Sequence, residues 1–262
     1  MGFRYSTGYR NFKMNGGSFQ QAIQNGDLRI YSGTQPATAD TAPSGTLLCT
    51  ITSASGARTA EVLSSATVTL ATGAAGSVNS ITVLATTLEL LAPNQFSAAV
   101  PVAFNTSLTQ TASDCVTQIN KGTWWHGFAA TSSGAIITVK PLPGLGDSIN
   151  TADITATCTT ITTTDVDFAG GVDPANGLQF GATASGEITK SGTWSGVNAA
   201  TGTAGWARFV GSIADAGGAS TTLIRVDMDI ATAGTIMTMS STALTSAATT
   251  TIDSVSISHP AS

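Results

Sequence analysis

Residues Leu223–Ile230 read Leu-Ile-Arg-Val-Asp-Met-Asp-Ile, and this stretch decides the fold class. Its apolar and charged side chains alternate: one parity holds Ile224, Val226, Met228 and Ile230, the other Arg225, Asp227 and Asp229. Because side chains along a strand alternate between its faces, the pattern predicts a β-strand with an apolar face on a core and a charged face in water.

The charged face of this strand is a candidate interaction site. Asp227 and Asp229 are two residues apart, and carboxylates of this kind bind Ca²⁺ when further oxygens are at hand. Arg225 lies on the same face, so we favour ion pairing or contact with a neighbouring subunit over a metal site. We therefore expect no metal and no cofactor here.

The composition extends the β prediction to the whole chain. Only 10% of the 262 residues are charged, and Gly numbers 28. Helical bundles favour Glu, Lys, Leu and Arg, whereas small and β-branched residues suit packed strands. A hydrophobic content of 42% with a net charge of −5 excludes a disordered chain.

Charge and cysteine usage restrict the partners. A pI near 4.7 argues against direct nucleic-acid binding, and no apolar run is long enough to span a membrane. The basic residues Arg4, Arg10 and Lys13 nevertheless gather near the N-terminus, which indicates either an arm that docks on an acidic partner or a solvated terminus. Three widely spaced cysteines predict neither a disulfide framework nor a zinc site and fit synthesis in a reducing compartment.

Turn signals divide the chain into three parts. Residues 1–27 predict an arm of short helices, one capped by Ser18. Residues 28–52 and 169–262 hold short strands between Gly-, Ala- and Ser-rich turns, the spacing of a sandwich. Between them, residues 53–168 predict strands on either side of a helix that starts at a capping box, Thr111–Asp114.

The expected fold is mainly β. It is a β-sandwich, Ig-like or jelly-roll-like, formed by discontinuous N- and C-terminal segments, with an inserted small α+β domain. Such an insertion is tolerated where the ends of a surface loop lie close together. Trp194 and Trp206 are expected in the core or at a subunit interface, where tryptophan is enriched.

Several segments resemble a family of tailed-bacteriophage virion structural proteins. They are Leu28–Asp40, Gly45–Thr50, Gly177–Gly181, Gly202–Phe209 and Ser241–Ser254. In compact members of that family, the strand that corresponds to the one ending here near Ile51 is followed almost directly by the segment that corresponds to Gly177–Gly181. Here a long block lies between the two. Its segments Asn105–Asp114 and Ala169–Asp173 resemble an insert of other phage structural proteins.

The resemblance implies a non-enzymatic role in the particle. The first expectation is a capsid decoration or cement protein, made in the bacterial cytoplasm and assembled in multiple copies on the virion. Its partners would be further copies of itself and the major capsid or tail and neck proteins. The alternative is a tail, neck or fibre component that binds a host receptor or glycan.

Candidate catalytic groups are sparse. A nucleophilic triad needs a histidine beside the nucleophile, and the histidines are His126 and His259. His259 is next to the C-terminus, and the serine of Gly192–Gly196 stands one place late for a Gly-x-Ser-x-Gly motif. Glu61, Glu89 and Glu187 lie too far apart in the sequence to indicate a catalytic carboxylate pair of a glycosidase. We therefore expect no enzyme.

Trp124, Trp125 and Phe128 form the one aromatic cluster with a candidate binding role. They could provide a sugar-stacking platform for a host receptor. Residues 124–130 also read as a strand, on which Trp124, His126 and Phe128 share a face, and aromatics in a small insert mostly fill its core. We favour the core over the platform.

Overall fold

The computed structural model describes residues 3–84, 86–88, 101–233 and 237–258. The chain divides into two compact units. The scaffold unit comprises Met1–Glu61 and Pro174–Ser262, and the insert unit comprises Val62–Asp173. The insert unit thus starts and ends later than the predicted 53–168. The predicted fold class is confirmed: the structure is mainly β, with antiparallel sheets in both units and a few short helices.

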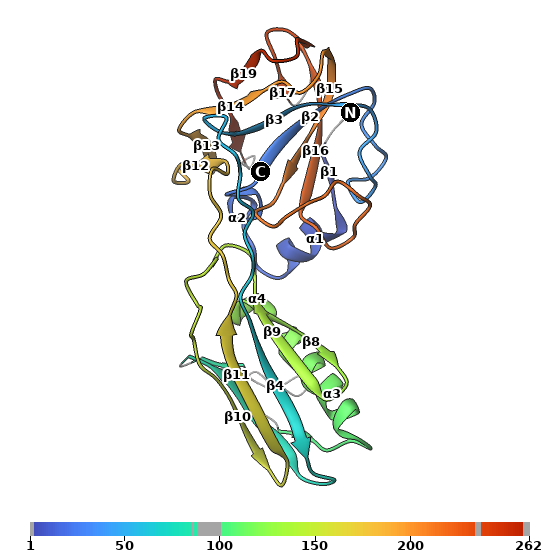
Figure 1. Ribbon diagram of the computed structural model, residues 1–262, viewed down its shortest axis with the longest axis vertical. Coiled ribbons are helices and arrows are strands. Elements are labelled where there is room, and N and C mark those ends of the chain that lie inside the picture. Colours follow the sequence, from blue (N-terminus) through green and yellow to red (C-terminus); the bar gives the residue numbers. More distant parts are fainter. Residues whose placement is uncertain (1–2, 85, 89–100, 234–236, 259–262) are drawn as a thin grey trace. The chain divides into compact units, whose positions relative to one another are not determined.

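The scaffold unit contains, in the described part of the chain, a nine-stranded sheet (Figure 1). Its strands are β1 (Arg4–Tyr5), β2 (Asp27–Ser32), β3 (Leu47–Ser53), β14 (Trp194–Val197), β15 (Gly202–Val210), β16 (Arg225–Ala231), β17 (Met237–Thr238), β18 (Ala243–Leu244) and β19 (Thr249–Ile252). The main order is β1-β16-β15-β2-β3-β14-β19, with β17 on β16 and β18 on β15. A smaller sheet holds β12 (Gln179–Phe180), β13 (Glu187–Ser191) and β20 (Ser256–Ser258).

Strand β2 explains why the scaffold unit needs both ends of the chain. It pairs with β15 on one side and with β3 on the other, both antiparallel. An N-terminal pair of strands is therefore enclosed between strands of the C-terminal segment. Trp194 and Trp206 are fully buried in this unit, so both are core residues within the chain.

The short N-terminal helices belong to the scaffold unit. They are α1 (Thr7–Met14) and α2 (Phe19–Ile23). The Ser18 cap is confirmed, because its hydroxyl accepts a hydrogen bond from the Gln21 N–H at 2.9 Å. Ser6 caps α1 and also donates to the Leu223 carbonyl at 2.8 Å. A Cβ at Gly8 would lie 2.4 Å from the same carbonyl oxygen, so only glycine allows this close approach.

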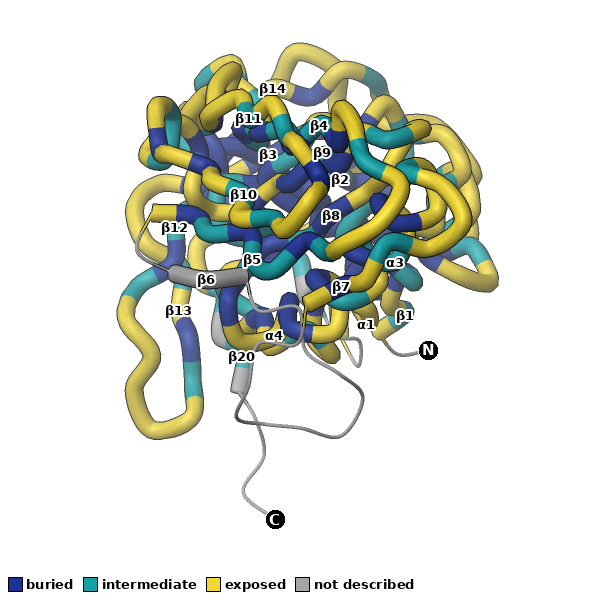
Figure 2. The backbone as a smooth tube through the Cα atoms, turned by 90° about the horizontal axis from the view of Figure 1, so that it is seen from below, coloured by how far each residue is buried: buried dark blue, intermediate teal, exposed yellow. Residues whose placement is uncertain are grey.

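In its described residues, the insert unit contains two four-stranded sheets and two helices. Its elements are β4 (Ser65–Thr72), β5 (Ser77–Val83), β6 (Thr86–Leu88), β7 (Val102–Ala103), α3 (Leu108–Lys121), α4 (Thr123–His126), β8 (Phe128–Ser133), β9 (Ile136–Pro141), β10 (Ile154–Thr159) and β11 (Thr162–Ala169). One sheet has the order β11-β4-β9-β8, and the other β10-β5-β6 with β7 on β5. Buried positions recur at every second residue over most of β4. Figure 2 colours the backbone by burial, with buried positions in dark blue and exposed positions in yellow.

Three predictions for the insert unit were wrong. Helix α3 begins at Leu108 rather than Thr111, because the Ser107 hydroxyl accepts the Gln110 N–H at 3.1 Å and caps it there. The predicted strand over 124–130 is instead the short helix α4, which ends where Gly127 adopts φ 77°, followed by β8. The Gly- and Pro-containing segment Phe168–Pro174 predicts an exit linker, whereas strand β11 extends over Thr162–Ala169. The sequence also predicts strands over Ser80–Leu91 and Thr235–Met239, whose residues 89–91 and 235–236 lie outside the described residues.

Candidate functional site

The charged face of β16 does not meet water, which corrects the sequence prediction. Arg225 and Asp227 are 0% exposed, and Asp229 is half-buried. The cover comes from the loop between β2 and β3: the carbonyls of Ala39 and Thr41 accept hydrogen bonds from Arg225 and Arg208 at 3.5 and 3.2 Å.

Two bidentate ion pairs occupy this covered face. Arg208 on β15 donates to both carboxylate oxygens of Asp227 at 2.6 and 2.8 Å, from the position directly across the strand pair. Arg225 donates to both oxygens of Asp215 at 2.6 Å. Bidentate arginine–carboxylate pairs are among the strongest hydrogen-bonded contacts, and they compensate for the loss of hydration of both ions.

A third group of charges continues this layer along β2. Asp27 accepts from Arg29 at 2.8 Å and from Arg58 at 3.1 Å. Arg58 also donates to the carbonyls of Asn25 and Gly211 at 3.1 and 2.8 Å. We call the whole set the ionic layer: Asp27, Arg29, Arg58, Arg208, Asp215, Arg225 and Asp227.

Burial and hydrogen bonding compete at the carboxylates of the ionic layer. At Asp227 burial prevails and raises the pKa, against the hydrogen bonds and charge of Arg208. At Asp215 burial also acts to raise the pKa, but the Arg225 hydrogen bonds and the Gly217 N–H prevail and lower it. At both sites the carboxylate oxygens are engaged by arginines of the same unit.

The basic N-terminal residues comprise one half-buried and two exposed members. Arg4 donates to the backbone carbonyls of Gln35, at 3.1 Å, and Pro36, and so is engaged within the scaffold unit. Arg10 and Lys13 are exposed on α1. Arg10 donates to the Thr7 hydroxyl at 2.8 Å. The surface available to an acidic partner is therefore smaller than the sequence indicated.

The aromatic cluster of the insert unit is divided between core and surface. Phe128 is buried and lies 5.7 Å from Phe168, ring centroid to ring centroid, as the core prediction had it. For Trp124 and Trp125 that prediction was wrong, because they are 57% and 41% exposed. The helical turn of α4 directs its first and last residues inward and the two tryptophans between them outward. We call Trp124 and Trp125 the tryptophan pair.

His126 is a structural residue beside this pair. Its Nδ1 accepts the Phe128 N–H at 3.1 Å, so Nε2 carries the proton and donates to the Ile119 carbonyl at 3.0 Å. Burial lowers the pKa of His126, against the hydrogen bond to Ile119, and favours the neutral ring. Both nitrogens are engaged by backbone, so the ring does not serve as a general base. His259 lies outside the described residues.

Carboxylates elsewhere are also engaged by the chain. Asp165 and Asp167 on β11 accept the N–H groups of Ala156 and Ile154 at 2.7 and 3.1 Å, and buried Glu61 accepts from the Ser212 hydroxyl. Over the residues that the structure covers, no three His, Cys, Asp or Glu side chains are grouped to hold a metal ion. Glu89 lies outside that part. Within it, no helix combines the length and apolar character of a membrane span.

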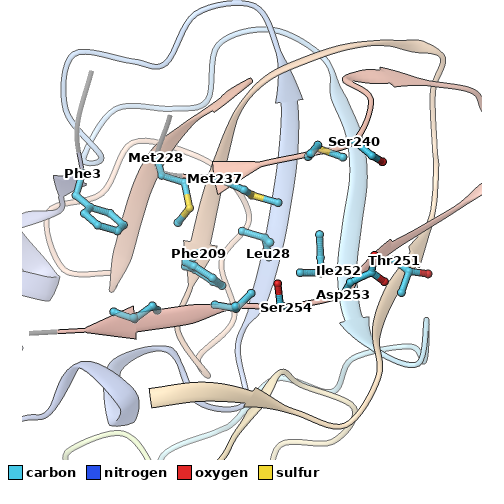
Figure 3. Close-up of a pocket in the computed structure, with 13 residues that line it drawn as sticks. Phe3, Leu28, Phe209, Met228, Met237, Ser240, Thr251, Ile252, Asp253 and Ser254 are labelled. Atoms are coloured by element: carbon cyan, nitrogen blue, oxygen red, sulfur yellow. The ribbon is translucent and has the colours of Figure 1, made fainter. Parts of the chain in front are cut away.

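The scaffold unit has a pocket of about 310 Å³, lined by apolar and polar groups, on the other face of its sheet (Figure 3). Sticks in Figure 3 mark its lining: Phe3, Leu28, Phe209, Met228, Met237, Met239, Ser240, Thr251, Ile252, Asp253, Ser254, Val255 and Ile257. Sequence reasoning missed this pocket, since the lining comes from segments far apart in the chain. One feature of the sequence pointed to this face: Met228 is among the alternating apolar residues of β16.

A comparison of the chain with protein-family models, with curated proteins and with solved structures found no match.

Proposed function

We propose that this protein is a non-enzymatic structural protein of a tailed-bacteriophage virion, present in multiple copies as a capsid decoration or cement protein. One observation carries the proposal. Two segments that resemble this family, Leu28–Asp40 and Gly202–Phe209, contribute strands β2 and β15, which pair along their length at the centre of one sheet. The residues that carry the resemblance thus cooperate in a single folded unit.

The chemistry of the candidate sites supports a structural role. In the ionic layer, arginines and carboxylates bind one another. The groups left at the surface, Arg10, Lys13 and the tryptophan pair, are of the kinds that form protein contacts. In this proposal Arg10 and Lys13 meet acidic residues of a neighbouring virion protein.

Backbone hydrogen bonds at the two ends of the insertion support the view that the insert unit is a module added to a complete scaffold unit. Thr59 and Ala175 exchange backbone hydrogen bonds of 3.0 and 3.1 Å within the scaffold unit. Val62 and Val172 do so within the insert unit at 3.1 and 3.0 Å. Each unit thus holds its two crossing segments side by side, the geometry that tolerates an insertion.

The test is to purify particles from lysates of the host that carries the gene and to count this protein against the major capsid protein by quantitative mass spectrometry. We expect a copy number comparable to that of the capsid protein. A few copies per particle would replace the decoration role by a tail or neck role. Absence from the particles would overturn the proposal.

The exposed tryptophan pair favours one second candidate, a tail or fibre component that stacks Trp124 and Trp125 on a host glycan. Aromatic faces at a surface are a common means of binding sugars and proteins alike. The test is adsorption of particles carrying Trp125→Ala. Reduced adsorption with normal assembly would support this candidate, and unchanged adsorption would remove it.

A further inference from the structure

The pocket of the scaffold unit has a floor of buried apolar side chains. Leu28, Phe209 and Met228 come from the neighbouring strands β2, β15 and β16, and each is less than 5% exposed. In Figure 3 these three side chains are gathered together, with Ile252, Asp253 and Ser254 of the C-terminal segment opposite them. Met237 and Met239 add two further thioethers to the wall.

The size and chemistry of this pocket suit a large aromatic ring. A dry cavity of about 150 Å³ accommodates benzene, so about 310 Å³ has room for the two-ring indole of tryptophan. Methionine sulfur makes favourable contacts with aromatic rings and adapts to their shape. The exposed rim residues Ser240, Asp253 and Ser254 carry oxygens that can accept the indole N–H.

The chain itself presents such rings. Trp124 is the most exposed aromatic side chain of the described residues, and Trp125 adjoins it. The other exposed aromatics are Phe3, which lines the pocket, and Tyr5, whose ring lies between Phe3 and Tyr9 with centroids 5.9 and 4.8 Å away. The tryptophan pair is therefore the exposed aromatic surface that can enter a pocket elsewhere.

We propose that the tryptophan pair of one copy docks into the scaffold-unit pocket of a second copy of this chain, with the indole rings on its apolar floor. The inference rests on the proposed multi-copy function and names the contact that builds the assembly. Donor and acceptor are different surfaces, so the contact can repeat from copy to copy into a ring or an array, or form reciprocally between two copies.

The surroundings of the tryptophan pair favour a protein pocket over a sugar. Sugar recognition adds hydrogen bonds from polar side chains to the hydroxyl groups. On α4 the neighbouring polar residues are Thr123 and His126, and both are buried. Since both ring nitrogens of His126 are hydrogen-bonded to backbone groups, α4 presents mainly apolar surface. Such a surface matches the sulfur- and phenyl-lined pocket.

The first part of the test measures self-association of the full chain by sedimentation velocity over a range of concentrations. We expect the wild-type mass to rise with concentration. W124A/W125A and a variant that fills the pocket mouth, Ser254→Trp, should each weaken association by at least about tenfold. Met14→Ala, at an exposed apolar residue outside both surfaces, is the matched control and should associate like the wild type.

The second part mixes the two defective variants. W124A/W125A keeps an intact pocket, and Ser254→Trp keeps an intact tryptophan pair. The mixture should therefore form a one-to-one dimer that grows no further, whereas each variant alone stays monomeric. Circular dichroism identifies variants that are folded. Should Ser254→Trp fail to fold, Ser240→Trp takes its place.

Several results would overturn the inference. They are a monomeric wild type, undiminished association of W124A/W125A, and a mixture that does not pair. Loss of host adsorption by W124A/W125A with unchanged self-association would also overturn it and favour the glycan candidate. Particles with W124A/W125A at full copy number contradict this inference alone, whereas wild-type particles without the protein contradict the proposed function.

Discussion

Strands β16 and β11 carry the same short pattern with opposite results. Each has two aspartates separated by one apolar residue: Asp227 and Asp229 in β16, Asp165 and Asp167 in β11. Asp227 is fully buried and bound by Arg208, whereas Asp167 is exposed and accepts the backbone N–H of Ile154. The alternation predicts a strand in both places but does not tell whether the polar face meets water.

The difference comes from what lies across each strand. β16 has Arg208 directly opposite Asp227, and the loop between β2 and β3 closes over the pair. β11 pairs with β4, whose residue opposite Asp165 is Val68, and its aspartates turn to backbone N–H groups of β10. A buried carboxylate needs a cation and a cover, and both are tertiary features.

Removal of Asp227 should have the largest effect on stability. Asp227→Ala leaves the guanidinium of Arg208 buried without its carboxylate, which costs about 3–5 kcal/mol of unfolding free energy. Urea unfolding followed by circular dichroism measures this loss. The matched control replaces both partners, Arg208→Met with Asp227→Leu, and should recover most of it. A loss below about 1 kcal/mol for Asp227→Ala would refute the ionic layer as we describe it.

The acid limb of stability should depend on Asp215. Its pKa is lowered in the folded state, so its contribution is present above the unfolded pKa of about 3.9 and lost as pH falls through the lower folded value. The unfolding free energy of the wild type should therefore fall below about pH 4 more steeply than that of Asp215→Asn. Equal slopes of the two proteins between pH 5 and the acid transition midpoint would contradict the Arg225–Asp215 pair.

The smallest effect is expected on β11. Asp167→Ala removes one acceptor from the Ile154 N–H at a partly solvated edge, which costs about 1 kcal/mol. Asp167→Asn keeps an oxygen acceptor and should cost less. If Asp167→Ala destabilised the chain as much as Asp227→Ala in the same urea titration, the contrast between the two strands would disappear.

Local signals predicted a large part of the fold. Alternation located most of β16, turn signals placed short strands on both sides of the insert, and the serine before Phe19 located the cap of α2. The discontinuous β scaffold followed from the placement of turn-rich segments on both sides of a different texture. Such signals depend on residues close together in the sequence, so they can be recognised without the structure.

The candidate sites depend on residues that are far apart in the sequence, and most of their arrangement could not be predicted from it. Arg208 and Asp215 come from separate segments to meet Asp227 and Arg225, so β16 alone indicated a solvated face. One turn of helix at α4, set by Gly127, moved the tryptophan pair from the predicted core to the surface. Both errors arose where tertiary context overrides a short local pattern.

The central claim is that the two ends of the chain form one self-sufficient scaffold held by the ionic layer. The most direct measurement is amide hydrogen exchange on a chain in which residues 62–173 are replaced by a short Gly-Ser linker. We predict that β2, β15 and β16 keep the protection that they have in the full chain and lose it together on unfolding. Fast exchange throughout these three strands in the shortened chain would contradict the claim.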